Sequence, residues 1–253
     1  MKRFSRSSLI AWGIIASFFL IWEWLVFVFQ LPEYILPAPS QVIRTLFNNT
    51  ALYASATLLT LGEALIGLAL GILAGWLVAS ILTLFPGLED GVMTLAILMK
   101  STPLVAIAPL LTLWLGFGAL PKIIITALMT FFPVLVNVLN GMQRVNPALL
   151  DLFRSWHASR WEIFLRLRLP SSVPNLFAAL KISGPLAFMG AVVAEWTGAS
   201  AGLGRTMWLA YANLNLPFLF AAILILAAAG MLFYRFLTWL EKSLIFWQPL
   251  SEL

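Results

Sequence analysis

The sequence predicts an all-α integral membrane protein with about six transmembrane helices. Of its 253 residues, 62% are hydrophobic and only 10% are charged. A soluble domain carries about 25% charged residues, so this chain has too few charges to cover a water-exposed surface of its size. A soluble enzyme and a disordered chain are therefore excluded, and we expect a single membrane domain over residues 1–253.

Six apolar stretches are long enough to cross a bilayer, which takes about 20 mostly apolar residues. They lie at 9–29, 54–84, 91–115, 120–142, 173–197 and 217–245. The first follows a basic N-terminus, as in a signal peptide, but its apolar run is longer and lacks a small-residue cleavage site. We therefore expect a retained N-terminal helix at 9–29, followed by core helices within 54–245.

The arginines and lysines predict the orientation. Five arginines fall in the segment 143–172, whereas the loops expected on the other side hold only Arg44, Lys122 and Arg205. Cytoplasmic loops are enriched in Lys and Arg. We therefore expect the 143–172 loop and both termini in the cytoplasm.

The second stretch carries a ladder of glycines four residues apart, Gly67, Gly71 and Gly75. Such a small-residue face lets two helix backbones approach closely in lipid. The glycine ladder therefore predicts close helix packing, either within one subunit or at a subunit interface.

Ionisable residues and prolines inside the spans are candidates for the transport pathway or its gate. Pro103 and Pro109 interrupt the third stretch, since proline removes a backbone donor, and Lys100 precedes them. Glu63 and Glu195 lie within other spans. Charges in a membrane are costly and mark either pathways or buried ion pairs, so both interpretations stay open for Glu63, Lys100 and Glu195.

The 143–172 loop begins with a predicted amphipathic helix. Asn146 is a favourable N-cap, and the proline after it suits the first helical position. Apolar residues then recur on one face of the helix, at Leu149, Leu152, Phe153 and Trp156.

A second short helix follows a turn at His157–Ala158. Ser159 and Glu162 form a capping box, in which each side chain accepts from the other residue's backbone N–H. We expect Leu169–Pro170 to end this helix. A turned pair of helices fits docking to a cytoplasmic partner better than lying flat on the bilayer.

The segment 151–170 resembles the EAA loop of binding-protein-dependent ABC importer permeases. Asp151-Leu152-Phe153 stands where the family has Glu-Ala-Ala, His157 where it has glycine, and Leu167, Leu169 and Pro170 where it has Ile-x-Leu-Pro. The resemblance implies that the loop couples to an ATPase. It assigns this coupling to Asp151, Phe153, Trp156, His157, Ala158, Ser159, Leu169 and Pro170.

Segments 37–40, 103–118, 131–134 and 194–204 extend the resemblance to the subfamily that imports nitrate, sulfonates, taurine and pyrimidine precursors of thiamine. It implies a type I (MetI-like) importer permease for such a small solute. The implied partners are a second permease copy in a homodimer, two cytoplasmic ABC ATPases, a solute-binding protein and the lipid bilayer. The implied location is the bacterial inner membrane.

Other chemistry finds little support in the residues. The chain has no Gly-x-x-x-x-Gly-Lys-Ser/Thr loop, so we expect no cofactor here, no enzyme activity in this chain, and ATP and Mg²⁺ on the partner ATPase. A nucleophile elbow at Ser200 would need a nearby histidine, but the single histidine, His157, is expected on the opposite side. Without cysteine or further histidine, a metal site is not expected, and the few cations do not indicate a nucleic-acid partner.

Two other functions remain open. An ion-coupled secondary transporter would be expected to show an inverted repeat and several mid-membrane carboxylates, and neither is evident. A membrane scaffold without transport would lack a neighbouring ATPase gene.

Overall fold

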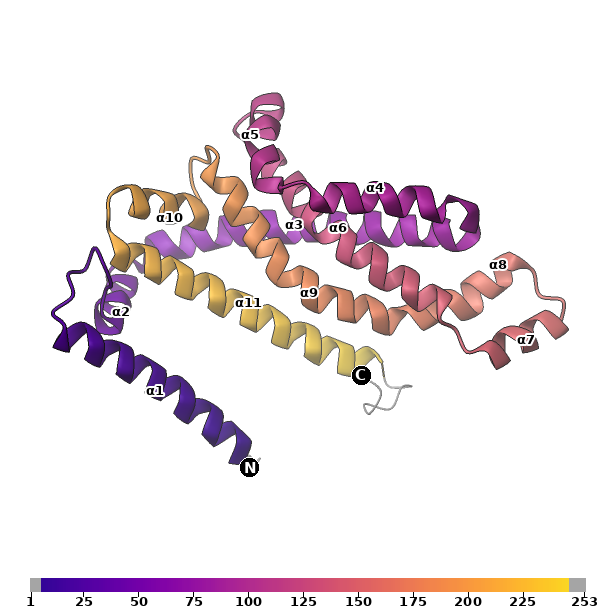
Figure 1. Ribbon diagram of the computed structural model, residues 1–253, viewed down its shortest axis with the longest axis horizontal. Helices are drawn as coiled ribbons and strands as arrows, with labels where there is room; N and C mark the ends of the chain where they lie inside the picture. Colours follow the sequence, from indigo (N-terminus) through magenta and orange to yellow (C-terminus); the bar gives the residue numbers. More distant parts are fainter. Residues whose placement is uncertain (1–5, 246–253) are drawn as a thin grey trace.

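The computed structural model describes residues 6–245, and every regular element there is helical (Figure 1). The α-helices are α1 (Arg6–Val28), α2 (Pro39–Asn48), α3 (Thr50–Leu84), α4 (Glu89–Ser101), α5 (Leu104–Leu115), α6 (Leu120–Gln143), α7 (Pro147–Ser155), α8 (Arg160–Ile163), α9 (Leu169–Trp196), α10 (Leu203–Ala212) and α11 (Leu216–Leu244). A 3₁₀ turn, η1 (Pro86–Leu88), precedes α4, and a π-helical turn, η2 (Phe164–Arg168), joins α8 to α9.

Four of these helices are long and apolar enough to cross a membrane: α3, α6, α11 and the combined helix Arg160–Trp196. A fifth crossing is present if the bent pair Pro86–Ser101 and Leu104–Leu115 counts as one. Within α1, the segment Gly13–Val28 is a shorter apolar helix. The structure thus confirms a multi-helix membrane protein.

The stretch expected as one span at 91–115 is instead two helices that meet at 90°. Pro103 causes the bend, because its ring disfavours a helical backbone in the preceding residue, and Thr102 is accordingly extended (ψ 128°). Pro109, in contrast, lies inside α5 without ending it. Of the two prolines expected to interrupt this span, only Pro103 does so.

The core is built where α6 packs along both α3 and α9. All three residues of the glycine ladder face α6: a Cβ at Gly67 would lie 2.5 Å from Thr126 Cβ, and one at Gly75 2.9 Å from Val134 Cγ1. At Gly71 the nearest atom is Thr130 Oγ1, and the carbonyl oxygen of Ala127 would be 2.8 Å away. The ladder therefore serves packing within the subunit.

The loops sort to two ends of the molecule. η1 and the α7–α8 pair lie at one end, and α2 and α10 lie at the other (Figure 1). The start of α1 and the end of α11 both point away from α2 and α10. This arrangement agrees with chain ends on one side of the membrane; which side that is stays a prediction.

The glycine ladder can be tested by a matched pair of substitutions on α3. Gly71→Ala places a methyl group against α6 and should destabilise by about 1–3 kcal/mol, the usual cost of overpacking. Gly62→Ala, whose new Cβ meets nothing within 4 Å, should be neutral or stabilising by up to about 1 kcal/mol. Thermal unfolding in detergent compares the two, and equal melting temperatures would refute the packing role.

Candidate functional site

The first candidate site is the 143–172 loop, and its first helix forms as predicted. The side chain of Asn146 accepts from the Ala148 N–H at 2.9 Å and caps α7. His157 adopts a left-handed backbone (φ 55°) directly after the helix, and the Ala158 N–H closes the turn on the Phe153 carbonyl at 3.0 Å. The helix end and the turn at His157–Ala158 are thereby confirmed.

The second helix starts at the predicted capping box. The Ser159 N–H donates to Glu162 Oε2 at 2.8 Å, and the Glu162 N–H donates to Ser159 Oγ at 3.2 Å. The expected stop at Leu169–Pro170 is wrong. The Leu169 N–H reaches back five residues to the Phe164 carbonyl, and this wider π-turn leads straight into α9, where Pro170 sits in the first turn and its missing N–H is tolerated.

The loop exposes a large aromatic surface. Trp156 is 69% exposed and Trp161 56% exposed, while Phe153 is half-buried, with its ring 6.1 Å from that of Trp156. Asp151 is exposed and pairs with Arg154 at 3.4 Å. His157, Ser159 and Pro170 are exposed, and Ala158 and Leu169 are half-buried. Exposed apolar surface of this kind is typical of a contact surface for another protein or a membrane.

The second candidate site is a buried polar cluster between α3, α6 and α9. Glu63 on α3 forms an ion pair with Lys122 on α6, with 2.5 Å between Nζ and Oε1, and both side chains are buried. Pairing offsets the cost of placing two charges in an apolar surrounding. Lys122, counted among the cations of the outer loops, thus lies inside α6 with its charge buried and paired.

Glu195 lies in the same region and holds the start of α10. It is fully buried; Oε1 accepts from the Thr60 hydroxyl at 2.6 Å and Oε2 from the Gly204 N–H at 2.5 Å. The Thr60 oxygen in turn accepts from the Leu203 N–H at 2.8 Å. Gly202 permits the approach with a left-handed backbone (φ 118°). Glu195 and Thr60 thus form a clamp on the N-terminus of α10.

Thr60 and Lys122 were missed by the sequence analysis. Thr60 lies three residues before Glu63, so both side chains occupy one helix face, and this spacing was the available signal. Lys122 follows Pro121 at the start of α6, where it resembles an ordinary loop cation.

Lys100 and Pro103 lie apart from this cluster. The Lys100 side chain is exposed, with Nζ 4.7 Å from the centre of the Phe132 ring. Phe132 is ten residues beyond Lys122 on α6, about 15 Å along a helix. The structure therefore brings Glu63 and Glu195 together and leaves Lys100 and Pro103 at the surface.

Comparison with known proteins places the chain in a family. A family model described as "Binding-protein-dependent transport system inner membrane component" matches residues 67–246. The chain belongs to this family. As a member, it is a transmembrane permease subunit of an ABC importer, so the secondary transporter and the scaffold are set aside.

Two relatives match this chain over most of their length. The formylaminopyrimidine transport permease protein ThiX of Halalkalibacterium halodurans is 35% identical, over 90% of this chain and 91% of the relative. The putative aliphatic sulfonates transport permease protein SsuC of Bacillus subtilis is 32% identical, over 86% of this chain and 80% of the relative. Both names fall in the subfamily that the sequence resembles.

The fold matches a solved transporter of the expected architecture. A chain of the MetNI methionine ABC transporter, in an inward-facing structure, superimposes with a TM-score of 0.68 at 17% identity. The match covers 78% of this chain and 97% of that chain. The chain therefore has the type I importer permease fold.

The clamp on α10 can be tested by removing one hydroxyl. Thr60→Val keeps the shape but leaves the Leu203 N–H and Glu195 Oε1 short of a partner, at a cost of about 1–3 kcal/mol. Thr57→Val, one turn away, removes only a bond to the Tyr53 carbonyl of the same helix and should cost less. Unfolding in detergent measures both, and a Thr60→Val protein as stable as Thr57→Val would argue against the clamp.

Proposed function

We propose that this permease works as a homodimer whose α7–α8 pairs face the cytoplasm and each dock on an ABC ATPase. The exposed aromatic surface at Trp156 and Trp161 carries this proposal. Of the coupling residues named above, Asp151, Phe153, Trp156, His157, Ala158 and Ser159 lie in α7 or in the turn that follows it, whereas Leu169 and Pro170 begin α9. The family's importers work with binding proteins. ATP and Mg²⁺ would be bound by the ATPase, and the location would be a bacterial inner membrane.

The combined helix from Arg160 to Trp196 supports a way to transmit the ATPase motion. It runs for 37 residues, about 55 Å, from the α7–α8 turn to the α10 clamp at Glu195. A rigid displacement of α8 would then tilt α9 and pull on the clamp. Rocking of helices around a fixed solute path is the general form of alternating access.

Glu195 suits a gate better than a solute-binding group. Both of its carboxylate oxygens already accept hydrogen bonds from the chain itself. Glu63 is likewise neutralised by Lys122. We therefore assign Glu195 to holding the N-terminus of α10 in place, Glu63 to the ion pair that joins α3 to α6, and Lys100 and Pro103 to the surface of the bent α4–α5 pair.

The solute would be small and delivered by a binding protein. The names of ThiX and SsuC point to a pyrimidine-type precursor or a sulfonate. Nitrate and taurine are the other solutes expected from the resemblance to the subfamily. Uptake of each radiolabelled candidate by vesicles containing the complete transporter would choose among them.

The docking proposal predicts that charge in the α7–α8 turn separates permease from ATPase. Ala158→Asp would bring a charge to the interface that must lose its water on docking. Trp156→Ala would remove apolar contact worth about 1.5–3 kcal/mol if fully buried, or roughly 10- to 150-fold in affinity. Copurification of the ATPase and solute uptake measure both variants.

The control for docking is Ala212→Asp, the same substitution at an exposed position at the end of α10. It should retain the ATPase fully. Normal copurification and uptake for Ala158→Asp would show that the 143–172 loop does not couple the subunits.

The orientation predicts opposite labelling of the two ends of the molecule. The chain contains no cysteine, so single cysteines report without background. Ser155→Cys in α7 should react only with reagents that reach the cytoplasm, and Ser200→Cys, exposed between α9 and α10, only with external ones. Labelling of position 155 from outside intact cells would reverse the proposed orientation.

A further inference from the structure

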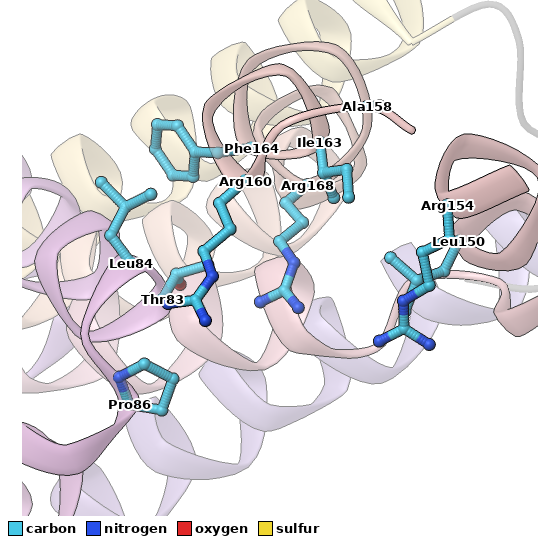
Figure 2. Close-up of a pocket in the computed structure, with 10 residues that line it drawn as sticks. All are labelled: Thr83, Leu84, Pro86, Leu150, Arg154, Ala158, Arg160, Ile163, Phe164 and Arg168. Carbon is cyan, nitrogen blue, oxygen red and sulfur yellow. The ribbon is translucent and has the colours of Figure 1, made fainter. Parts of the chain in front are cut away.

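A pocket of about 510 Å³ lies between the end of α3 and the α7–α8 pair. Leu84 and Pro86 line one side, Phe164 another, and three arginines complete the wall: Arg154, Arg160 and Arg168. Figure 2 shows the three guanidinium groups turned in the same direction into this space. The pocket is thus lined by cations from both α7 and the helix that follows it.

The positive charge of the pocket is only partly compensated. Arg154 pairs with Asp151 at 3.4 Å. Within residues 6–245, neither Arg160 nor Arg168 forms an ion pair with a carboxylate. The nearby carboxylate of Glu162 instead caps Ser159. Like charges that line one pocket repel one another, so the arrangement favours an anion in the pocket.

The chemistry of the side chains suits an oxyanion such as a phosphate group. A guanidinium presents a planar fork of donors that matches phosphate oxygens in a bidentate manner. Two such forks, those of Arg160 and Arg168, line the same pocket (Figure 2). A carboxylate fits the same forks, so the surroundings of the pocket must distinguish between the two kinds of anion.

The surroundings indicate that the phosphate carries acyl chains. Large apolar side chains flank Leu84 and Pro86 along the chain and are strongly exposed: Ile81 at 48%, Phe85 at 61% and Leu88 at 51%. The pocket therefore lies at the end of α3, a helix long and apolar enough to cross a membrane, and the residues next to its lining along the chain are exposed and apolar. Basic pockets of this kind between membrane helices bind anionic lipid head groups.

We propose that this pocket binds the head-group phosphate of an anionic phospholipid. Arg160 and Arg168 hold the phosphate, and the acyl chains lie along Phe85 and Ile81. The lipid then bridges the end of α3 and the start of α8. A bound lipid would thereby steady the helix pair at the point where α8 begins.

Native mass spectrometry of the full-length chain in neutral detergent tests the proposal. The probes are short-chain phosphatidylglycerol and phosphatidylcholine. We expect at least tenfold tighter binding of phosphatidylglycerol. Arg160→Gln and Arg168→Gln should each reduce this preference to about twofold or less. The matched control is Arg235→Gln, an exposed arginine of α11 outside the pocket, which should keep the full preference.

Three results would overturn the proposal. The first is an unchanged preference in Arg160→Gln, whose exposed side chain makes misfolding a poor explanation once its melting temperature in phosphatidylcholine matches that of the parent chain. The second is displacement of phosphatidylglycerol by micromolar glycerol phosphate, which would make the ligand a soluble anion. The third is loss of the lipid when an ATPase subunit is added, which would assign the arginines to an acidic surface of that partner.

Discussion

The close approach of α3 to α6 is the constraint on which the rest of the structure depends. In lipid, burial of apolar surface does not by itself drive helices together, so short-range packing and polar bonds must do so. The glycine ladder leaves three positions without a side chain on the α3 face that meets α6. At this distance Lys122 reaches Glu63. Thr126 is held from the other side as well, because a Cβ at Gly190 of α9 would lie 3.3 Å from its Cα.

The α8–α9 helix then connects two regions with opposite chemistry. Its first turns carry arginines and an exposed tryptophan, and its last turn carries a buried carboxylate. Pro170 lies in the first turn of α9, where its missing N–H is tolerated. The π-turn at Phe164–Arg168 joins α8 to α9 in one continuous helix. Such turns occur frequently at functional sites, and this one lies between the proposed ATPase contact and the membrane.

Local signals in the sequence were sufficient wherever a few neighbouring residues decide the structure. The Asn146 cap, the turn at His157 and the Ser159–Glu162 box depend on bonds within about four residues, and all three formed as predicted. The glycine ladder likewise revealed close packing, although only the structure shows that its partner is α6 of the same chain. The fold class followed from composition and the spacing of apolar stretches.

Contacts between residues far apart in the sequence could not be predicted in the same way. Lys122 resembled an outer loop cation because its partner, Glu63, lies 59 residues away in the sequence. The helix stop at Pro170 was predicted because proline usually ends a helix. No local sequence pattern indicated the π-turn through which the helix continues into α9. Errors of both kinds arise where tertiary packing overrides a local preference.

The buried carboxylates show why a charge in a membrane span is weak evidence for a solute site by itself. Glu63 has a cation beside it, and Glu195 receives one backbone N–H and one hydroxyl. Glu195 is also fully buried, so a solute could reach its oxygens only if the helices around it moved apart. For Glu195 those donors belong to the start of α10 and to Thr60, so its bonds can break only if α10 or α3 shifts relative to α9. The bonds of this carboxylate form only while α10 and α3 keep these positions against α9. Glu195 therefore stabilises one arrangement of the helices, as a gate residue must.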